Sequence, residues 1–190
     1  MLPHQRSLFA AGEPEIDASV AVERITLDDR SWVDVARNWL RGADELLDVL
    51  IETVEWRQGR RRMWERMVDD PRLSCWFRDG DQLPHPVLHT IRAALGERYD
   101  VPFGSVGCNF YRDGNDSVAP HSDRELRDVD DALVAIVTLG GRRPFLLHPK
   151  AGGACQAGWN HGVPKVKRAG PRISTTWRWA RHRDEAVSPT

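Results

Sequence analysis

The sequence predicts an α+β domain in which helices come first and short strands follow, forming a sandwich or barrel. Up to residue 104 the apolar residues recur mostly at helical spacing, whereas after Gly104 they alternate with polar residues. The chain has 190 residues, which is enough for one domain with a hydrophobic core of its own.

The N-terminal part is predicted to be an arm followed by helices. Residues 1–30 mix proline, glycine and acidic residues around one apolar alternation, VAVERITL, which is typical of an edge strand. From Ser31, which suits an N-cap, the apolar residues up to Leu40 follow helical spacing. A second helix is expected to begin at Gly42 and run through Val54, and a third over residues 87–95.

Four later segments have the alternation of strands: SVGCNFY (105–111), ALVAIVTL (132–139), PFLL (144–147) and RISTTWRW (172–179). The polar residues 180–190 are expected to form a flexible tail. The predicted organisation is therefore an arm over residues 1–30, a single domain over 31–179 and this tail.

Charge and cysteine content exclude several classes of protein. With 27 basic and 28 acidic residues the net charge is −1, so nucleic-acid binding would require a local basic patch. Three cysteines without C-x-x-C spacing argue against a disulfide framework or a thiolate zinc site. No segment approaches the roughly 20 apolar residues of a membrane span. We therefore expect a cytoplasmic protein with no membrane partner. A monomer is expected as well, although the sequence does not fix the oligomeric state.

His121, Asp123 and one further histidine form a candidate metal site. In an extended segment, residues two apart point the same way, so His121 and Asp123 can face one ion. H-x-D alone is a weak signal, because the polarity of a surface turn explains it as well. The third ligand is His148 or His161, and we favour His161, which lies in the strand-like WNHGV. Two imidazoles and a carboxylate hold one face of an octahedral iron(II) and leave other positions open.

The segment RISTTWRW would place Arg172, Ser174 and Arg178 on one face of a strand, although a solvated polar face is the alternative. A guanidinium beside a hydroxyl is a good carboxylate receptor, because its planar fork donates paired hydrogen bonds. Arg172 and Arg178 would lie about 20 Å apart along a strand. Arg172 with Ser174 therefore suits a carboxylate remote from the metal, and Arg178 an anionic group nearer to it. Asn109 and Tyr111 would complete the receptor, although ordinary strand packing explains Tyr111 equally well.

Four motifs together resemble the AlkB family of iron(II)- and 2-oxoglutarate-dependent dioxygenases, which demethylate nucleic-acid bases. The resemblance implies a double-stranded β-helix (jelly-roll) core over residues 104–179, N-terminal helices, and a substrate-recognition region over residues 55–100. The motifs are NFYRDGNDSVAPHSD (109–123), VTLG (137–140), WNHGVPK (159–165) and RISTTWR (172–178), with a weaker DPRLSCWF (70–77).

The resemblance also implies Fe(II), 2-oxoglutarate as cosubstrate, and O2. In this chemistry an N-methyl group of alkylated DNA or RNA is oxidised and leaves as formaldehyde, while 2-oxoglutarate becomes succinate and CO2. The implied iron ligands are His121, Asp123 and His161, and the implied 2-oxoglutarate ligands are Asn109, Tyr111, Arg172, Ser174 and Arg178.

The damaged base must leave the stack to reach such a metal. By position, Trp76 or Phe77 would stack on it, and Glu125 would read a base edge. The basic and aromatic segment WRQGRRRMWERM (56–67) would contact phosphates, although a solvated helix face accounts for any single arginine as well.

One departure from the family pattern bears on activity. Family members carry a further strand and turn where this chain runs from Lys150 through AGGACQAG directly to Trp159. The fold is thus expected to lack or shorten one core strand between residues 150 and 159, which would expose a sheet edge and loosen the site. We expect a dioxygenase that repairs alkylated DNA or RNA. The alternatives are a degenerate, weakly active or inactive relative that binds nucleic acid, and an oxygenase that hydroxylates a protein or small molecule.

Overall fold

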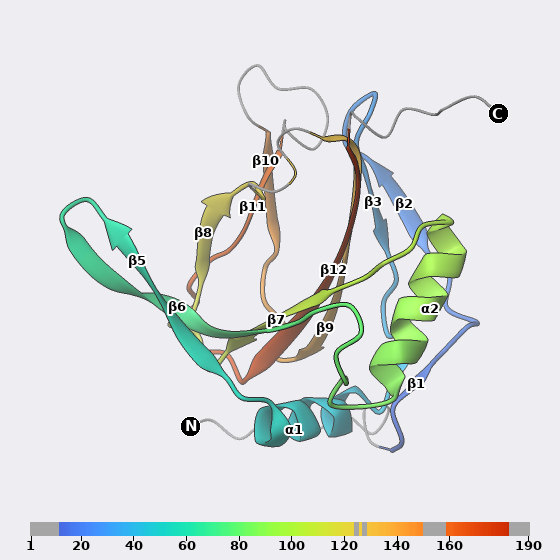
Figure 1. Cartoon of the computed structure of the whole chain (residues 1–190), viewed down its shortest axis with the longest axis horizontal. Helices are drawn as coiled ribbons and strands as arrows, with labels where there is room; N and C mark the ends of the chain where they lie inside the picture. Colours follow the sequence, from blue (N-terminus) through green and yellow to red (C-terminus); the bar gives the residue numbers. More distant parts are fainter. Residues whose placement is uncertain (1–11, 124–125, 127–128, 150–158, 183–190) are drawn as a thin grey trace.

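Two antiparallel sheets form the centre of the computed structural model, which describes residues 12–123, 126, 129–149 and 159–182 (Figure 1). In the larger sheet the strand order is β5 (Arg57–Met63), β6 (Arg66–Phe77), β7 (Val106–Tyr111), β12 (Arg172–His182) and β9 (Val129–Gly140). In the smaller sheet it is β10 (Leu146–Pro149), β11 (Trp159–Val163) and β8 (Val118–His121).

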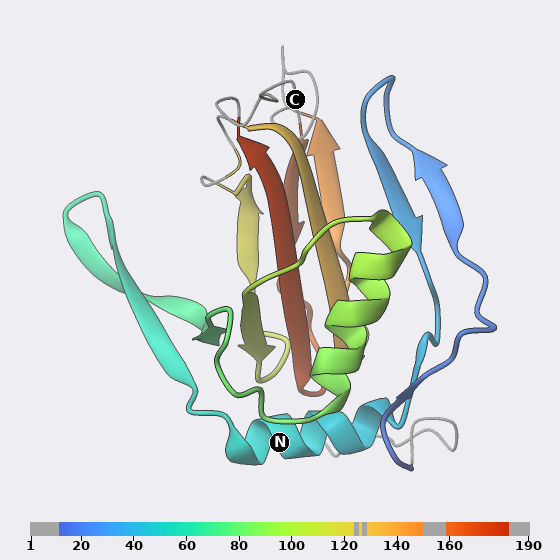
Figure 2. The same ribbon diagram turned by 45° about the vertical axis from the view of Figure 1, so that its right-hand side comes forward.

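The main core lies between the larger sheet and two helices, α1 (Ala43–Thr53), which lies across one end of the strands, and α2 (Val87–Tyr99), which runs beside them (Figure 2). Leucines of α1 and α2 pack there against apolar side chains of β7, β9 and β12. Ile173 and Trp177 of β12 are fully buried in this core. Each such side chain contributes roughly 1.5–3 kcal/mol to folding. Since strand side chains alternate, Arg172, Ser174 and Thr176 of β12 point to the other face.

That other face of the larger sheet looks toward the smaller sheet. Tyr111 of β7, Val118 of β8 and Val163 of β11 form a second buried cluster, which joins the two sheets. His161 of the WNHGV motif and Arg172 and Ser174 of the RISTTWR motif are therefore brought to the space between the sheets.

The prediction of several N-terminal helices is wrong, because residues 32–35, which were expected in the first of them, form a strand. β2 (Glu23–Thr26) and β3 (Trp32–Val35) make an antiparallel hairpin, and β1 (Glu15–Ile16) pairs with β4 (Leu40–Arg41). Only α1, over the second expected stretch, is helical in this region.

Turn chemistry explains this difference. The backbone N–H of Arg30 donates to Asp28 Oδ1 at 2.9 Å, and the N–H of Leu27 donates to the Ser31 carbonyl at 2.9 Å. These bonds close a turn over residues 27–31, so that Ser31 ends a hairpin loop and does not cap a helix. The helical spacing of the following apolar residues is overridden by this turn.

The arginine-rich segment 56–67 lies on a β-hairpin and not on a helix. β5 and β6 are joined by a two-residue turn between Met63 and Arg66, and Trp64 in that turn has φ 55° and is 94% exposed. Figure 1 shows this hairpin projecting away from the rest of the molecule.

The later strands form where the alternation predicts them, with shifted bounds. The predicted 144–147 strand is β10 at 146–149, and the predicted 132–139 strand extends over β9 at 129–140. Residues 150–158, where a core strand was expected to be missing or short, lie outside the described residues. Of the helices described, neither α1 nor α2 has the length and apolarity needed to cross a membrane.

Candidate metal centre and cosubstrate pocket

A β-bulge brings the two candidate histidines together. β8 and β11 pair at His121–His161 and at Val118–Val163, so between these pairs β8 has two residues where β11 has one. The extra residue lets both Val118 and His121 point between the sheets. Gly162 permits this close pairing, because a Cβ there would lie 3.1 Å from the Pro120 nitrogen and from the Val118 carbonyl oxygen. The imidazole centroids of the two histidines are 4.4 Å apart.

Asp123 completes the cluster with one carboxylate oxygen. Its Oδ1 lies 3.9 Å from Nε2 of His121 and 3.9 Å from Nε2 of His161. Its Oδ2 accepts a hydrogen bond from Arg178 Nε at 3.0 Å. The two oxygens therefore have different partners: Oδ1 faces the histidines, and Oδ2 is held by the guanidinium.

The charge state of these groups suits a metal ion. Burial raises the pKa of Asp123, but the hydrogen bond and charge of Arg178 and the two histidines outweigh it and hold the pKa below its ordinary value. Burial lowers the pKa of His161, and the His121 ring lowers it further, against the opposing effect of Asp123. An ionised carboxylate and a neutral imidazole are the forms that bind metals.

The ligand atoms of His121, Asp123 and His161 all lie within 4.8 Å of one another. His121 Nδ1 lies 2.9 Å from the Ala119 carbonyl, and donating to it would leave the Nε2 lone pair for an ion. The donor set of two imidazoles and one carboxylate fits iron(II). His148, the alternative third ligand, pairs with Asn160 on β11 and is not part of the cluster.

The predicted carboxylate receptor lines one face of β7 and β12. Arg172 lies opposite Tyr111 and Ser174 opposite Asn109 in the strand register. Arg172, Ser174 and Tyr111 are all buried, and the Arg172 guanidinium lies 5.1 Å from the Tyr111 ring centroid. The structure thus brings these four sequence-predicted residues together.

Arg172 has an unmet hydrogen-bonding capacity. Its Nη1 is buried and has no hydrogen-bond partner among the described residues. Burial lowers the pKa of this guanidinium, an effect that Tyr111 opposes, yet an arginine stays charged. Because an unpaired buried charge is costly, an anionic ligand such as the remote carboxylate of 2-oxoglutarate fits this position.

Arg178 lies apart from this receptor. Besides its bond to Asp123, its guanidinium lies 5.8 Å from the Trp76 ring centroid. In this structure its Nε therefore orients a candidate metal ligand.

Two further residues near the cluster were not predicted from the sequence. Arg72 donates from Nε to Asn109 Oδ1 at 2.8 Å, its Nη1 is buried without a partner among the described residues, and its charge helps to lower the pKa of His161. Phe145 stacks on the His161 ring, with centroids 5.7 Å apart and an interplanar angle of 19°. Arg72 could have been predicted, because alternation along β6 places it on the same face as Trp76. Nothing in the sequence indicated the position of Phe145.

The two candidates for base stacking separate in the structure. Trp76 is 51% exposed on the side of Arg178, whereas Phe77 packs against the main core. Gly107, opposite Trp76, leaves room for the indole, since a Cβ there would lie 2.6 Å from Trp76 Cζ3. Trp76 is therefore the candidate that remains for this role. Glu125, predicted to read a base edge, lies outside the described residues.

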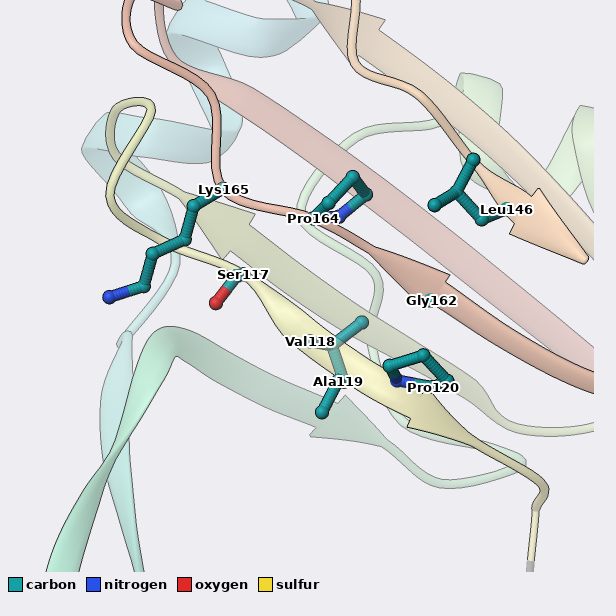
Figure 3. A pocket seen from close by; sticks show the side chains of 8 residues that line it. All are labelled: Ser117, Val118, Ala119, Pro120, Leu146, Gly162, Pro164 and Lys165. Atoms are coloured by element: carbon teal, nitrogen blue, oxygen red, sulfur yellow. The ribbon is translucent and has the colours of Figure 1, made fainter.

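A shallow hollow of about 240 Å³ lies beside β8 and β11 (Figure 3). It is lined by residues such as Pro120, Gly162 and Pro164, which alternate with the histidines along their strands. None of the three candidate metal ligands lines it, so this hollow is separate from the candidate metal centre.

Comparison with known proteins finds curated relatives that share one name. No protein-family model matches the chain. Among curated proteins, the chain is 29% identical over 215 residues to "Alpha-ketoglutarate-dependent dioxygenase alkB homolog 3" of Mus musculus, covering 93% of this chain and 73% of that protein. The proteins of the same name from Homo sapiens and Bos taurus are each 28% identical over 218 residues, with the same coverage.

Proposed function

Because the chain belongs to the AlkB family of 2-oxoglutarate-dependent dioxygenases, we propose that it removes methyl groups from alkylated bases of DNA or RNA. The observation that carries this proposal is the convergence of His121, Asp123 and His161, together with a buried, partly unpaired Arg172 on the face of the larger sheet that looks toward them. Iron(II), 2-oxoglutarate and O2, when bound, supply the oxidation of a C–H bond, with succinate and CO2 as products.

The residues of the chain would position these reactants. Oδ1 of Asp123 and Nε2 of each histidine would hold the iron, while Arg178 keeps the Asp123 carboxylate oriented and ionised. The Arg172 guanidinium, with Ser174 beside it, would bind the remote carboxylate of 2-oxoglutarate by paired hydrogen bonds.

Trp76 would receive the damaged base. Its exposed indole lies on the same side of the sheet as Arg178, which contacts Asp123. A base that has left the nucleic-acid stack regains stacking energy on such an aromatic face, about 1–3 kcal/mol per base. This arrangement supports a nucleic-acid substrate over a small molecule.

We also propose that the two sheets are the two layers of a double-stranded β-helix. The five-stranded and three-stranded antiparallel sheets face each other, and the candidate site lies between them. The site would then be held by rigid strands, which favours precise positioning of catalytic groups.

The β5–β6 hairpin would bind the phosphates of the substrate. Three of its arginines are paired with carboxylates: Arg57 with Glu55, Arg60 with Asp69 and Arg61 with Asp70. Arg66 is exposed and lies on β6, the strand that also carries Arg72 and Trp76. Arg62 is exposed as well, but it lies opposite Met67 and so on the other face of the hairpin.

We expect Arg66→Ala to weaken binding of a single-stranded oligonucleotide and to reduce the slope of log K against log salt concentration by about one, because one phosphate contact is lost. Arg62→Ala is the matched control, since it removes the same charge from the other face. Fluorescence anisotropy over a range of salt concentrations measures both. Equal slopes for Arg66→Ala and the unmodified protein would contradict a contact between Arg66 and a phosphate of the oligonucleotide.

The test of the proposed function is a mass-spectrometric assay on oligonucleotides with 1-methyladenine or 3-methylcytosine. With iron(II), 2-oxoglutarate and O2 we expect loss of the methyl group and formation of succinate. DNA and RNA oligonucleotides of the same sequence, with unmethylated controls, identify the preferred substrate. If no methylated nucleic acid stimulates succinate formation while the metal and 2-oxoglutarate bind, the proposed substrate class is wrong.

A further inference from the structure

We propose that Asp28, in the turn of the β2–β3 hairpin, positions His161 by holding Trp159, the first residue of β11. The inference rests on the proposed function in one respect, that His161 binds the metal ion. It assigns to the N-terminal hairpin a part in building that site.

A single hydrogen bond links two segments far apart in the sequence. Trp159 Nε1 donates to Asp28 Oδ2 at 2.7 Å. The other carboxylate oxygen, Oδ1, accepts the backbone N–H of Arg30 at 2.9 Å. Because both oxygens are engaged, the Asp28 side chain is fixed by its own turn and presents Oδ2 to the indole. The hydrogen bond from Trp159 is the largest cause of a pKa of Asp28 below its ordinary value.

The start of β11 has little other support. In the described register, β8 pairs with β11 only from His161 onward, so Trp159 and Asn160 have a strand partner on the β10 side alone. The residue opposite Trp159 on β10 is Pro149, which has no backbone N–H to donate. The hydrogen bond to Asp28 therefore stabilises an end of the strand where the ladder is weakest.

The hairpin itself is attached to the body of the protein. Trp32 of β3 stacks on Tyr99 of α2, with ring centroids 5.9 Å apart. The Tyr99 hydroxyl donates to Asp34 Oδ2 at 3.2 Å, and Arg24 donates to both oxygens of the same carboxylate. The turn that carries Asp28 thus belongs to a hairpin that Tyr99 of α2 fixes at two points, at Trp32 directly after the turn and at Asp34 two residues further along β3.

Trp159 and His161 are two residues apart on one strand, so their side chains share a face and lie about 7 Å apart along it. A strand end that frays or rotates at Trp159 would move the His161 imidazole relative to His121 and Asp123. Groups that orient metal ligands typically contribute ten- to hundredfold to metal affinity. Asp28 acts on His161 only through Trp159, so we expect its contribution to metal affinity to be near tenfold.

The test is a titration of the metal-free protein with Co(II) without O2, followed by the visible absorption of the bound ion. We expect Asp28→Ala and Trp159→Phe each to raise the Kd for Co(II) about tenfold. The double variant is expected to match either single variant, since both remove one hydrogen bond. Asp29→Ala is the matched control, because its exposed side chain neighbours Asp28 in the same turn. His161→Ala gives the effect of complete loss of the ligand.

Thermal unfolding of the metal-free variants separates positioning from stability. A lower unfolding midpoint with an unchanged Kd for Co(II) would show that the hairpin only stabilises the fold, and would overturn the inference. Independent tenfold effects that multiply in the double variant would overturn it too. If the unmodified protein binds no Co(II), the proposed metal site itself fails, and that result is distinct from both.

Discussion

Replacing Asp123 with alanine is expected to abolish formation of the iron(II)–2-oxoglutarate complex and to reduce turnover more than about a hundredfold, beyond the effect of losing an orienting group. Asp123 supplies the only carboxylate of the described metal cluster, and its Oδ1 lies 3.9 Å from both histidine nitrogens. Its removal leaves two imidazoles facing the Arg178 guanidinium, which repels a cation. The weak visible charge-transfer band of the anaerobic complex and the rate of succinate formation measure the loss.

His121→Ala should give the same loss of the band. His148→Ala is the matched control, because this histidine lies on the neighbouring strand but outside the cluster, and it should keep both band and turnover. A band of normal intensity in folded Asp123→Ala protein would show that the three side chains do not form the iron site.

Replacing Arg172 with alanine is expected to raise the Kd for 2-oxoglutarate about a hundredfold while the Kd for Co(II) stays nearly unchanged. The variant removes up to two charge-assisted hydrogen bonds, each worth roughly 1.5–3 kcal/mol. Arg172 is only 4% exposed and its Nη1 is unpaired. In the variant, water therefore does not readily take the place of the guanidinium as a hydrogen-bond donor to the carboxylate. Isothermal titration of the Co(II)-loaded protein with 2-oxoglutarate measures the change.

Arg172→Lys separates charge from geometry. Lysine keeps the positive charge but loses the planar fork, so we expect an intermediate Kd. Arg142→Ala is the matched control, because Arg142 is exposed and lies beside the half-buried Arg143 in the loop after β9. If Arg172→Ala binds 2-oxoglutarate as tightly as the unmodified protein, the remote carboxylate is bound elsewhere.

The period-two pattern of the sequence carried most of the information about the site. Alternation along RISTTWRW placed Arg172 and Ser174 on one face, and the register with β7 brings Asn109 and Tyr111 opposite them. The bulge in β8 was not predictable, because it depends on how closely two strands approach at Gly162. The hydrogen bond of Arg178 to Asp123 depends on the packing of one sheet on the other, which a linear pattern does not contain.

The N-terminal region shows the opposite case. Its apolar spacing fits a helix, but the carboxylate of Asp28 forms a local turn that no periodicity expresses. Propensity and spacing are weak signals when a short polar side chain offers the backbone a competing hydrogen bond. The same turn then makes a contact with Trp159, 131 residues away, which only the folded chain reveals.

Strand β5 pairs with β6 on one side and forms one edge of the larger sheet, and it carries four arginines among its seven residues. An uncovered strand edge can pair with the same edge of another copy, and this is a common route to aggregation. The arginine side chains of β5, three of which form ion pairs with nearby carboxylates, place charged groups along this edge, and such groups oppose pairing with another copy. Substitutions that neutralise this strand would therefore act on solubility as well as on the proposed nucleic-acid binding, and the two effects need separate controls in any study of the hairpin.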